Sequence, residues 1–437
     1  MQETQNKTAL VWFRNDLRVH DNQVLQTALN QNNSLLAVYC FDPRHFEITR
    51  FGFKKTEKFR AKFLIETLKD LQQNLSTLNI HLITFFEQPE TVIPRLIQKH
   101  DINSLYLQKE WTEEEVFVFD RVKDQLPSHV QIFEFYDQFL YHPDDIPFQI
   151  NDIPKVFTEF RKVVEKDAKI RTLTTLAEPL SNFQHIEPTQ IPSLEDLGLV
   201  DFETHSYSAF PFKGGESYAL KRLKDYFFET KKLGVYKKTR NGLIGPDFSS
   251  KFSPWLANGS LSPRTVYWEV KRFEEEHFKN ESTYWLIFEL IWRDYFKYIS
   301  LKYGNAIFKI GGILHKNYKW NQNEEEITNW IEGRTVEPFV NANMIEIKKT
   351  GWMSNRGRQN VASYFAKSLG LDWRIGASYF ESMLIDYDVH SNYGNWMYVS
   401  GVGNDPRDRH FNVKLQAERY DSNGSYQHLW LQKTLFE

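Results

Sequence analysis

The chain has 437 residues, about two to three times the usual size of one domain, so its length predicts two domains that each bury a core. Hydrophobic residues make up 41% of the chain and charged residues 25%, a balance that excludes collagen-like, fully disordered and coiled-coil proteins. The formal net charge is -3, so a nucleic-acid site would have to be a local basic patch. Cys40 is the only cysteine, which excludes an internal disulfide and suits a reducing compartment.

Short apolar runs alternate with amphipathic stretches up to about residue 135. The runs at 9–13, 35–41, 80–86, 105–107 and 130–135 predict strands. Between the second and third runs, apolar residues from Phe59 to Leu75 recur at helical spacing, as expected of a crossover helix that covers a parallel sheet. We therefore expect an α/β domain with a doubly wound, Rossmann-like parallel sheet over residues 1–136. No glycine-rich phosphate loop follows a predicted strand, so an ordinary dinucleotide or ATP site is not expected there.

The pattern changes twice after this domain. Residues 137–211 are rich in proline, with one short basic helix predicted at 157–164, and we expect an interdomain connector that packs against both domains or acts as a lid. Residues 212–437 predict an all-α domain, in which Ser253 and Ser262 each precede a proline and provide a capping hydroxyl at a helix start. No apolar run reaches the length of a membrane span, and we expect a cytoplasmic protein.

A predicted helix over 284–294 is apolar almost all round, yet it contains Glu289 and Arg293 one turn apart. One interpretation is an internal ion pair between these two residues. The other is a pocket wall, in which both side chains bond to a polar ligand and Trp292 offers a flat ring for stacking. The sequence leaves both open.

Three segments carry side chains suited to ligand binding. Residues 249–253 precede a helix, where backbone N–H groups and hydroxyls suit a phosphate, or where one serine is a plain cap. Asn355, Arg358 and Gln359 fall on one face of a later helix with Arg356 pointing elsewhere, unless this is merely a solvated basic face. The carboxylates of residues 386 and 388 lack the further ligands that a metal needs, so we expect no metal and favour bonds to heterocyclic N–H groups.

Ten of the twelve tryptophans lie after residue 250. Trp320, Trp373 and Trp396 stand in helical contexts, where large aromatic side chains usually fill a core. A row of closely spaced indoles would also carry electrons between the surface and a buried redox cofactor. Sequence spacing does not choose between the two interpretations.

Long motifs occur in a fixed order along the whole chain: VWFRNDLR at 11–18, FKGGES at 212–217, KFSPWL at 251–256, LSPR at 261–264, FELIWRD at 288–294, TGWMSNRGRQN at 350–360 and IDYD at 385–388. They resemble the photolyase/cryptochrome superfamily. Residues 392–407 (NYGNWMYVSGVGNDPR) are most similar to the DASH cryptochromes. His390 and Tyr393 stand where DASH sequences more usually have Cys and Trp.

The resemblance implies an N-terminal antenna domain and a helical domain that holds FAD in a folded conformation. In it, the 249–253 segment and Tyr236 would hold the phosphates and ribityl chain, Arg358 and Asp386 would pair beside the ring system, Asp388 would bind the ring edge, and Asn392 would face flavin N5. The complete set of implied FAD-binding residues is Tyr236, Ser249, Ser250, Lys251, Phe252, Ser253, Arg293, Trp352, Asn355, Arg358, Asp386, Asp388, Asn392 and Asn395.

The resemblance also implies a cavity for damaged DNA. Glu289 would bond to the linked pyrimidines, Trp292 would pack on them, and Tyr398 stands where photolyases of duplex DNA usually have a second tryptophan. Asn355 would also face the substrate, and Arg356 and Arg409 would contact DNA phosphates. Trp396, Trp373 and Trp320 match an electron relay that runs from the flavin to the surface.

The implied activity is light-driven repair of cyclobutane pyrimidine dimers in single-stranded DNA by electron transfer from excited reduced FAD, in a protein expected to be a monomer. Glu110 matches the acidic residue that binds a second, antenna cofactor, 5,10-methenyltetrahydrofolate. The alternative function is a blue-light photoreceptor that binds DNA or a partner without repair. The presence of Glu289 and Trp292 favours repair, because signalling needs no lesion-binding carboxylate.

Overall fold

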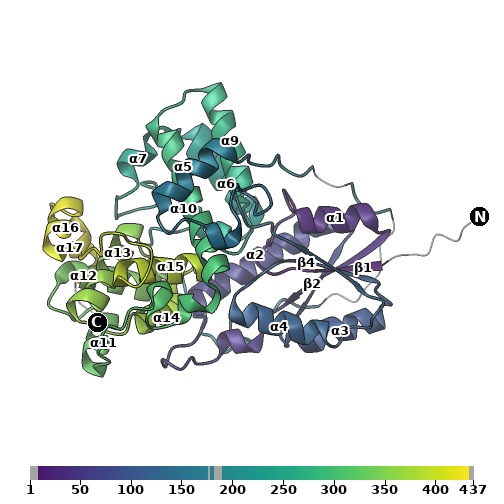
Figure 1. Ribbon diagram of the computed structural model, residues 1–437, viewed down its shortest axis with the longest axis horizontal. Coiled ribbons are helices and arrows are strands. Elements are labelled where there is room, and N and C mark those ends of the chain that lie inside the picture. Colours follow the sequence, from purple (N-terminus) through teal and green to yellow (C-terminus); the bar gives the residue numbers. More distant parts are fainter. Residues whose placement is uncertain (1–7, 176–177, 182–188, 433–437) are drawn as a thin grey trace, which may run out of the picture.

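A computed structural model describes residues 8–175, 178–181 and 189–432. An α/β domain lies at one end of the molecule and a larger group of helices at the other (Figure 1). The sheet consists of β1 (Thr8–Trp12), β2 (Ser34–Cys40), β3 (His81–Phe85), β4 (Ser104–Gln108) and β5 (Gln131–Phe135), all parallel, in the order β3-β2-β1-β4-β5. Each strand lies within one residue of its predicted run, so the strand predictions are confirmed.

Helices cover both faces of the sheet, as a doubly wound fold requires. Ala9 and Val11 of β1 share a core with α1 (Gln23–Gln31) and α2 (Lys58–Ser76). The alternate residues Leu10 and Trp12 pack instead with α3 (Pro89–Lys99) and α4 (Glu113–Lys123). Both faces of each inner strand are therefore buried, which is why the strands appear in the sequence as continuous apolar runs.

The connector packs against both domains. Leu194, Leu197 and Leu199 complete the core under α1 and α2. Phe160, on the predicted basic helix α5 (Phe157–Asp167), belongs to the core of the helical domain instead. Pro188, one of the prolines of this stretch, lies outside the described residues, and the predicted domain boundaries at 136 and 211 remain predictions.

The described residues after 212 form helices and turns and contain no β-strand. The α-helices are α6 (Glu216–Lys224), α7 (Tyr236–Thr239), α8 (Ser253–Ala257), α9 (Pro263–Glu276), α10 (Glu281–Tyr303), α11 (Glu324–Ile331), α12 (Pro338–Thr350), α13 (Asn355–Ser363), α14 (Trp373–Met383), α15 (Val389–Ser400), α16 (Val413–Tyr420) and α17 (Ser425–Leu431). The long helix α10 runs through the middle and contacts α5, α7, α9 and α15. None of the described helices is both long enough and apolar enough to cross a membrane.

One of the two predicted serine caps is present. Ser262 caps α9, and its hydroxyl accepts a hydrogen bond from the Arg264 amide at 3.1 Å. The prediction for Ser253 is wrong: α8 begins at Ser253 itself, Phe252 holds the cap position, and no side chain caps this helix. Lys251 has a left-handed backbone (φ 63°), and this turn brings the chain into the helix one residue earlier than expected.

A buried charge network joins the two domains. Arg18 and Asp21 follow β1, Asp137 begins the connector, and Arg264 belongs to α9; each is at most 3% exposed. Arg264 bonds to Asp21 at 3.0 Å and to Asp137 at 2.7 Å, while Arg18 bonds to the second oxygen of Asp137 at 2.5 Å. The two positive and two negative charges balance, so their burial is tolerated and the domains are held in one orientation.

Candidate flavin and substrate site

Glu289 of α10 forms an ion pair with Arg240, which follows α7, and not with Arg293. Arg293 donates instead to the main-chain oxygens of Gln138 at 2.6 Å and Leu256 at 2.9 Å. The interpretation of an internal pair along α10 is therefore wrong, because these two carbonyls already take up the Arg293 donors. Burial raises the pKa of Glu289, and Arg240 opposes that rise.

Aromatic side chains surround Trp292 on the same helix. Phe157 stacks on it with ring centroids 3.7 Å apart and planes at 13°. Tyr398 meets it edge-on at 6.0 Å, and the Arg409 guanidinium lies 5.9 Å from the Tyr398 ring. The structure thus brings together Trp292, Tyr398 and Arg409 as the sequence predicts, and adds Phe157, for which no sequence signal existed.

Trp352 lies at the centre of a charged cluster. The Lys251 ammonium lies 4.7 Å from its ring centroid and the Arg358 guanidinium 5.4 Å away. Arg358 also bonds to both oxygens of Asp386, at 2.8 and 3.0 Å, so the predicted Arg358–Asp386 pair is present. Residues from three separate segments of the chain therefore gather around one indole, with Asp386 joined through Arg358.

Lys251 shows that this cluster fits an anionic cofactor. Its side chain is buried, yet no oxygen of the described residues lies within hydrogen-bonding distance of Nζ. Burial lowers the pKa of Lys251 to about 8, and burial also raises the pKa of the nearby Glu346 to about 7. A buried cation needs a counter-charge, and a phosphate group would supply one.

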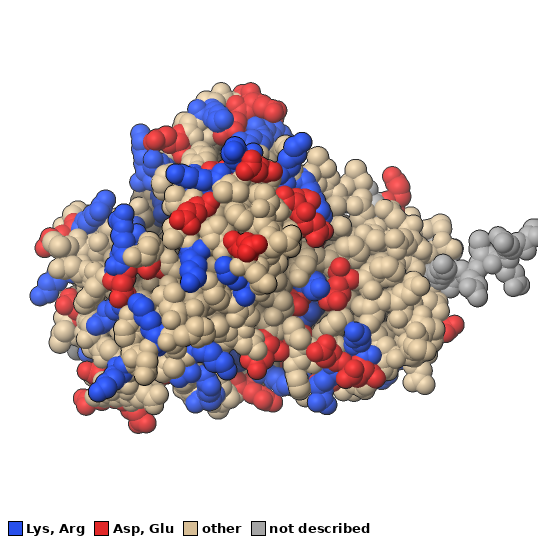
Figure 2. All heavy atoms as spheres, in the orientation of Figure 1, with Lys and Arg blue, Asp and Glu red and all other residues tan. Residues whose placement is uncertain are grey.

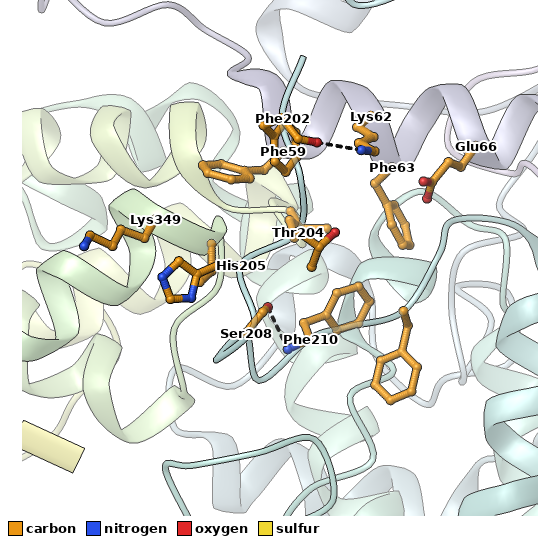
Figure 3. Close-up of a pocket in the computed structure, with 13 residues that line it drawn as sticks. Phe59, Lys62, Phe63, Glu66, Phe202, Thr204, His205, Ser208, Phe210 and Lys349 are labelled. Atoms are coloured by element: carbon orange, nitrogen blue, oxygen red, sulfur yellow. Dashed lines mark hydrogen bonds between the residues drawn. The ribbon is translucent and has the colours of Figure 1, made fainter. Parts of the chain in front are cut away.

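Behind Trp352, Phe210 stacks on the indole at 5.2 Å with planes at 16°. Phe210 also lines a small cavity with Phe59, Phe63 and Phe202, in which Lys62 donates to the Phe202 carbonyl (Figure 3). The volume of about 40 Å³ leaves room for little more than a water molecule. This cavity therefore supports the indole from behind and is too small for a cofactor.

The remaining predicted flavin residues differ in their placement. Tyr236 is buried at the start of α7, and the main-chain oxygens of Ser249 and Ser250 accept hydrogen bonds from Arg222, which the sequence did not reveal. Asn392 is buried and donates to the Ala377 carbonyl at 3.0 Å, which leaves its side-chain oxygen as an acceptor. Asn395 is exposed and donates to the Ser391 carbonyl of its own helix.

The side chains of α13 do not lie on the two faces that the sequence predicts. Asn355 is exposed at the first position of the helix. Arg356 donates to the side chain of Gln359 at 2.8 Å and to Asn241 at 3.3 Å, so the prediction that Arg356 points away from Gln359 is wrong. One turn of helix separates the two residues, and their long side chains meet across it.

The three tryptophans of the predicted relay lie around α14. Trp396 of α15 is buried and packs on Gly376, where an added Cβ would lie 2.2 Å from the ring. Trp373 begins α14 and donates to the Ile310 carbonyl at 3.0 Å. Trp320 is only partly buried, and the next residue, Asn321, bonds to Gly370 just before α14. The sequence did not reveal Trp330, whose ring centroid lies 6.3 Å from that of Trp396.

A cavity of roughly 990 Å³ lies between the domains. It opens at the carboxyl ends of β1 and β4, between which the strand order reverses, and such a position is the usual ligand site of a doubly wound sheet. Glu110 lies there, and its carboxylate accepts hydrogen bonds from Gln108 at 2.8 Å and Asn15 at 3.4 Å. Burial raises the pKa of Glu110.

The helical domain contributes charged residues to the opposite wall of this cavity. Arg293 and Asp388, both predicted to bind flavin, line it together with Lys297. Lys297 bonds to Asp388 at 3.0 Å, and the other Asp388 oxygen caps α15 through the Ser391 amide at 2.8 Å. Lys297 holds the pKa of Asp388 well below its usual range, against the effect of burial. Asp388 is therefore an ionised carboxylate, held by Lys297 in the cavity wall.

Charge on the surface is mixed. Figure 2 shows lysine and arginine side chains over α5, α7 and α9, interspersed with acidic side chains. A nucleic-acid site on this face would therefore be local, as the net charge of -3 predicts. In the part of the chain that the structure describes, no group of three or more His, Cys, Asp or Glu side chains is placed to hold a metal ion.

Comparisons with known proteins agree with this architecture. Residues 9–181 match the family model of DNA photolyase, and residues 285–434 match that of the FAD binding domain of DNA photolyase. Cryptochrome DASH of Gloeobacter violaceus is 47% identical, covering 97% of this chain and 85% of that protein, and cryptochrome DASH of Danio rerio is 46% identical, covering 98% and 83%.

Solved structures agree as well. The crystal structure of a Synechocystis cryptochrome matches with a TM-score of 0.92 and 45% identity, covering 97% of this chain and 88% of that one. An archaeal photolyase from Sulfolobus tokodaii with two FAD molecules matches with a TM-score of 0.78 and 25% identity, covering 97% and 90%. With its doubly wound sheet, its charged cluster around Trp352 and this full-length similarity, the chain belongs to the cryptochrome DASH family of photolyase-like flavoproteins.

Proposed function

We propose that the protein repairs cyclobutane pyrimidine dimers in single-stranded DNA under blue light. The observation that carries this proposal is Glu289, a partly buried carboxylate that lies three residues before Trp292 on α10, where the Trp292 ring meets Tyr398 edge-on. A carboxylate accepts hydrogen bonds from pyrimidine N–H groups, and the aromatic rings pack on the faces of a base. A light receptor without repair would not need this combination.

The cofactor would be held by the cluster around Trp352. Lys251 would bind the phosphates, the Arg358–Asp386 pair would lie beside the ring system, and Asn392 would offer its side-chain oxygen. Reduced FAD bound there would supply, on absorbing blue light, the electron that splits the cyclobutane ring and that returns afterwards. The helices α10, α13 and α14 each pack against α15, and this packing would limit the access of water to the bound cofactor.

The preference for single strands rests on the cost of reaching the lesion. A dimer has to leave the base stack to enter a cavity, and this costs least when the strand is already unpaired. Tyr398 offers less stacking area than a tryptophan in the same place would, which reduces the energy available for extracting a dimer from a duplex. Arg356 and Arg409 are the candidate phosphate contacts, and Asn355 is the candidate polar contact at the cavity rim.

The large cavity between the domains supports a second chromophore. Its volume of roughly 990 Å³ suits a ligand of cofactor size, and we propose 5,10-methenyltetrahydrofolate, with Glu110 accepting hydrogen bonds from the pterin. A second flavin is the competing ligand, since a photolyase with two FAD molecules has a similar fold. Denaturing the purified protein and identifying the released chromophores by absorbance distinguishes folate from flavin.

The monomeric state and the cytoplasmic location remain predictions.

A second candidate function is that of a light receptor. It is favoured by the position of Trp396, Trp373 and Trp320 along α14, from buried to partly exposed, because a relay of this kind reduces the flavin in light without any DNA. A repair assay separates the two functions. Chemically reduced protein is illuminated with a thymine dimer in matched single- and double-stranded oligonucleotides, with Glu289→Gln as the control. Repair of single strands that depends on Glu289 supports the lyase, whereas photoreduction without repair of either substrate supports the receptor.

A further inference from the structure

His390 joins the two domains at the wall of the interdomain cavity. It stands in the first turn of α15, is only 2% exposed, and lines the cavity. Its ring stacks on Trp111 of the α/β domain, with centroids 4.5 Å apart and planes at 19°. Stacking on Trp111 fixes the plane of the imidazole ring. The hydrogen bonds around the ring then determine where its two nitrogens lie.

Ser300 determines which nitrogen carries the proton. Its hydroxyl oxygen lies 2.7 Å from the Lys297 carbonyl oxygen, 2.8 Å from the Trp111 indole nitrogen and 2.7 Å from His390 Nδ1. Two oxygens at 2.7 Å repel each other unless a hydrogen lies between them, so the single hydroxyl proton points to the Lys297 carbonyl. The Ser300 oxygen must then accept from both Trp111 and His390. His390 Nδ1 is therefore protonated.

The ring is neutral as well as oriented. The charged groups nearest to it are Lys297 and Arg293, which disfavour an imidazolium ion, and Asp388, which favours one. Burial and the two cations prevail and hold the pKa of His390 well below its usual range. With the proton on Nδ1, the other nitrogen, Nε2, carries a lone pair and acts as a hydrogen-bond acceptor.

His390 lines the cavity, and no described residue forms a hydrogen bond to Nε2. Nε2 is therefore the ring nitrogen available to a ligand in the cavity. The carboxylate of Glu110 lies in the same cavity, and both residues are electrostatically coupled to Lys297. Glu110 and His390 thus each present a hydrogen-bond acceptor to this cavity, one from each domain.

We propose that His390 is a specificity-determining residue of the interdomain cavity, where Nε2 accepts a hydrogen bond from an N–H group of a planar heterocyclic ligand. This inference rests on the proposed antenna site and adds a residue from the helical domain to the recognition by Glu110. The ligand class is a reduced pterin or a related heterocycle that carries N–H donors at more than one position. A cysteine in place of His390 would offer only a weak sulfur acceptor.

Two substitutions distinguish the role of Nδ1 from that of Nε2. In His390→Asn, the side-chain amide can still donate to Ser300, but nothing replaces Nε2. In His390→Gln, the longer side chain can place an acceptor near the position of Nε2, but the bond to Ser300 is lost. Equilibrium binding of 5,10-methenyltetrahydrofolate to FAD-loaded protein is followed by folate absorbance, with the flavin spectrum and the thermal midpoint of each variant as controls for folding.

We expect His390→Asn to raise the Kd for the folate about tenfold and His390→Gln to change it less than about threefold, the difference expected of one hydrogen bond. Ser300→Ala supplies an independent measurement, since Ser300 does not line the cavity but holds the proton on Nδ1; it should weaken binding by about threefold to tenfold. Parent-like binding by both His390→Asn and Ser300→Ala, with the parent binding folate, would overturn the role of His390 and leave the antenna site intact. A parent protein that binds no folate would overturn both.

Discussion

Arg240 and Glu289 form an ion pair although they are 49 positions apart along the chain. The pair connects the segment after α7 with the middle of α10 and lies next to the buried hydroxyl of Tyr236. The pair holds the positive guanidinium of Arg240 beside the Glu289 carboxylate, which we propose binds the lesion. Any pyrimidine N–H that bonds to Glu289 must share this carboxylate with Arg240, and the ionisation of Glu289 depends on Arg240.

Replacement of Arg240 should shift the pH dependence of repair. Burial raises the pKa of Glu289 and the Arg240 guanidinium lowers it, so in Arg240→Gln the pKa of Glu289 should rise further. At a given pH less of the carboxylate is ionised, so the acid limb of the repair profile should move to higher pH. Repair rates between pH 5 and 9 on a single-stranded dimer measure the shift, with Lys238→Met, at an exposed lysine, as the control for loss of a positive charge. An acid limb at the parent position in Arg240→Gln would contradict this electrostatic role.

Loss of Lys251 should weaken FAD binding. Its buried ammonium lies over Trp352 and near Glu346 but forms no hydrogen bond to a described residue, so a cofactor phosphate would supply a directly bonded counter-charge. We expect Lys251→Met to raise the Kd for FAD by about tenfold to a hundredfold, as for a charge-assisted hydrogen bond, measured by flavin fluorescence on refolded or stripped protein. Lys238→Met, at an exposed lysine, should leave the Kd unchanged.

The lowered pKa of Lys251 predicts that the affinity for FAD depends on pH. The pKa of Lys251 is lowered to about 8, so the free protein loses this charge as the pH rises through 8. FAD affinity should therefore decline above about pH 8 in the parent. Lys251→Arg should remove this decline, because a guanidinium stays charged throughout that range. A parallel decline in both proteins would mean that another group is responsible.

Two neighbouring tryptophans allow a specific test of the relay. Trp396→Phe should slow photoreduction of oxidised flavin at least about tenfold, because the electron would have to bypass the indole. Repair by chemically reduced protein should be unaffected. Trp330→Phe is the matched control, since Trp330 is equally buried and lies 6.3 Å from Trp396 but is not part of the predicted relay. Normal photoreduction in Trp396→Phe, or an equal loss in Trp330→Phe, would exclude the predicted route.

Because Asp16 is buried, we expect the free energy of unfolding to fall as the pH rises from weakly acidic to neutral. Asp16 is fully buried after β1; one oxygen accepts from the Arg14 amide at 2.8 Å and the other has no partner among the described groups. Burial raises its pKa from 3.8 to about 7, so the folded chain binds the proton more tightly than the unfolded chain does. Its contribution to stability is complete below about pH 4 and is lost as the pH rises through 7.

Asp16→Asn should remove this dependence while it keeps the bond to the Arg14 amide. We expect the free energy of unfolding of the parent to fall between pH 5 and pH 8.5 by about 2–3 kcal/mol more than that of the variant. Urea unfolding at the two pH values measures the difference. Identical pH slopes in the two proteins would show that Asp16 is ionised when folded.

The sequence by itself determined the sheet, the helical second domain and the family. The inner strands of the sheet were recognisable because both of their faces are buried, so each is a continuous apolar run. Every strand was found within one residue of its bounds. The Ser262 cap was also predictable, since a helix cap depends on neighbouring residues only. The motifs placed the Arg358–Asp386 pair correctly, although the residues are 28 positions apart.

Only the tertiary structure decided the partners of the charged and aromatic side chains. The pairing of Glu289 with Arg240, the stacking of Phe157 on Trp292 and the contact of His390 with Trp111 all join distant parts of the chain. A helical period shows which side chains share a face, but it does not show which other element packs against that face. Partners, protonation states and accessible nitrogens depend on that packing, because burial and the distance to neighbouring charges set the free energy of each ionised form.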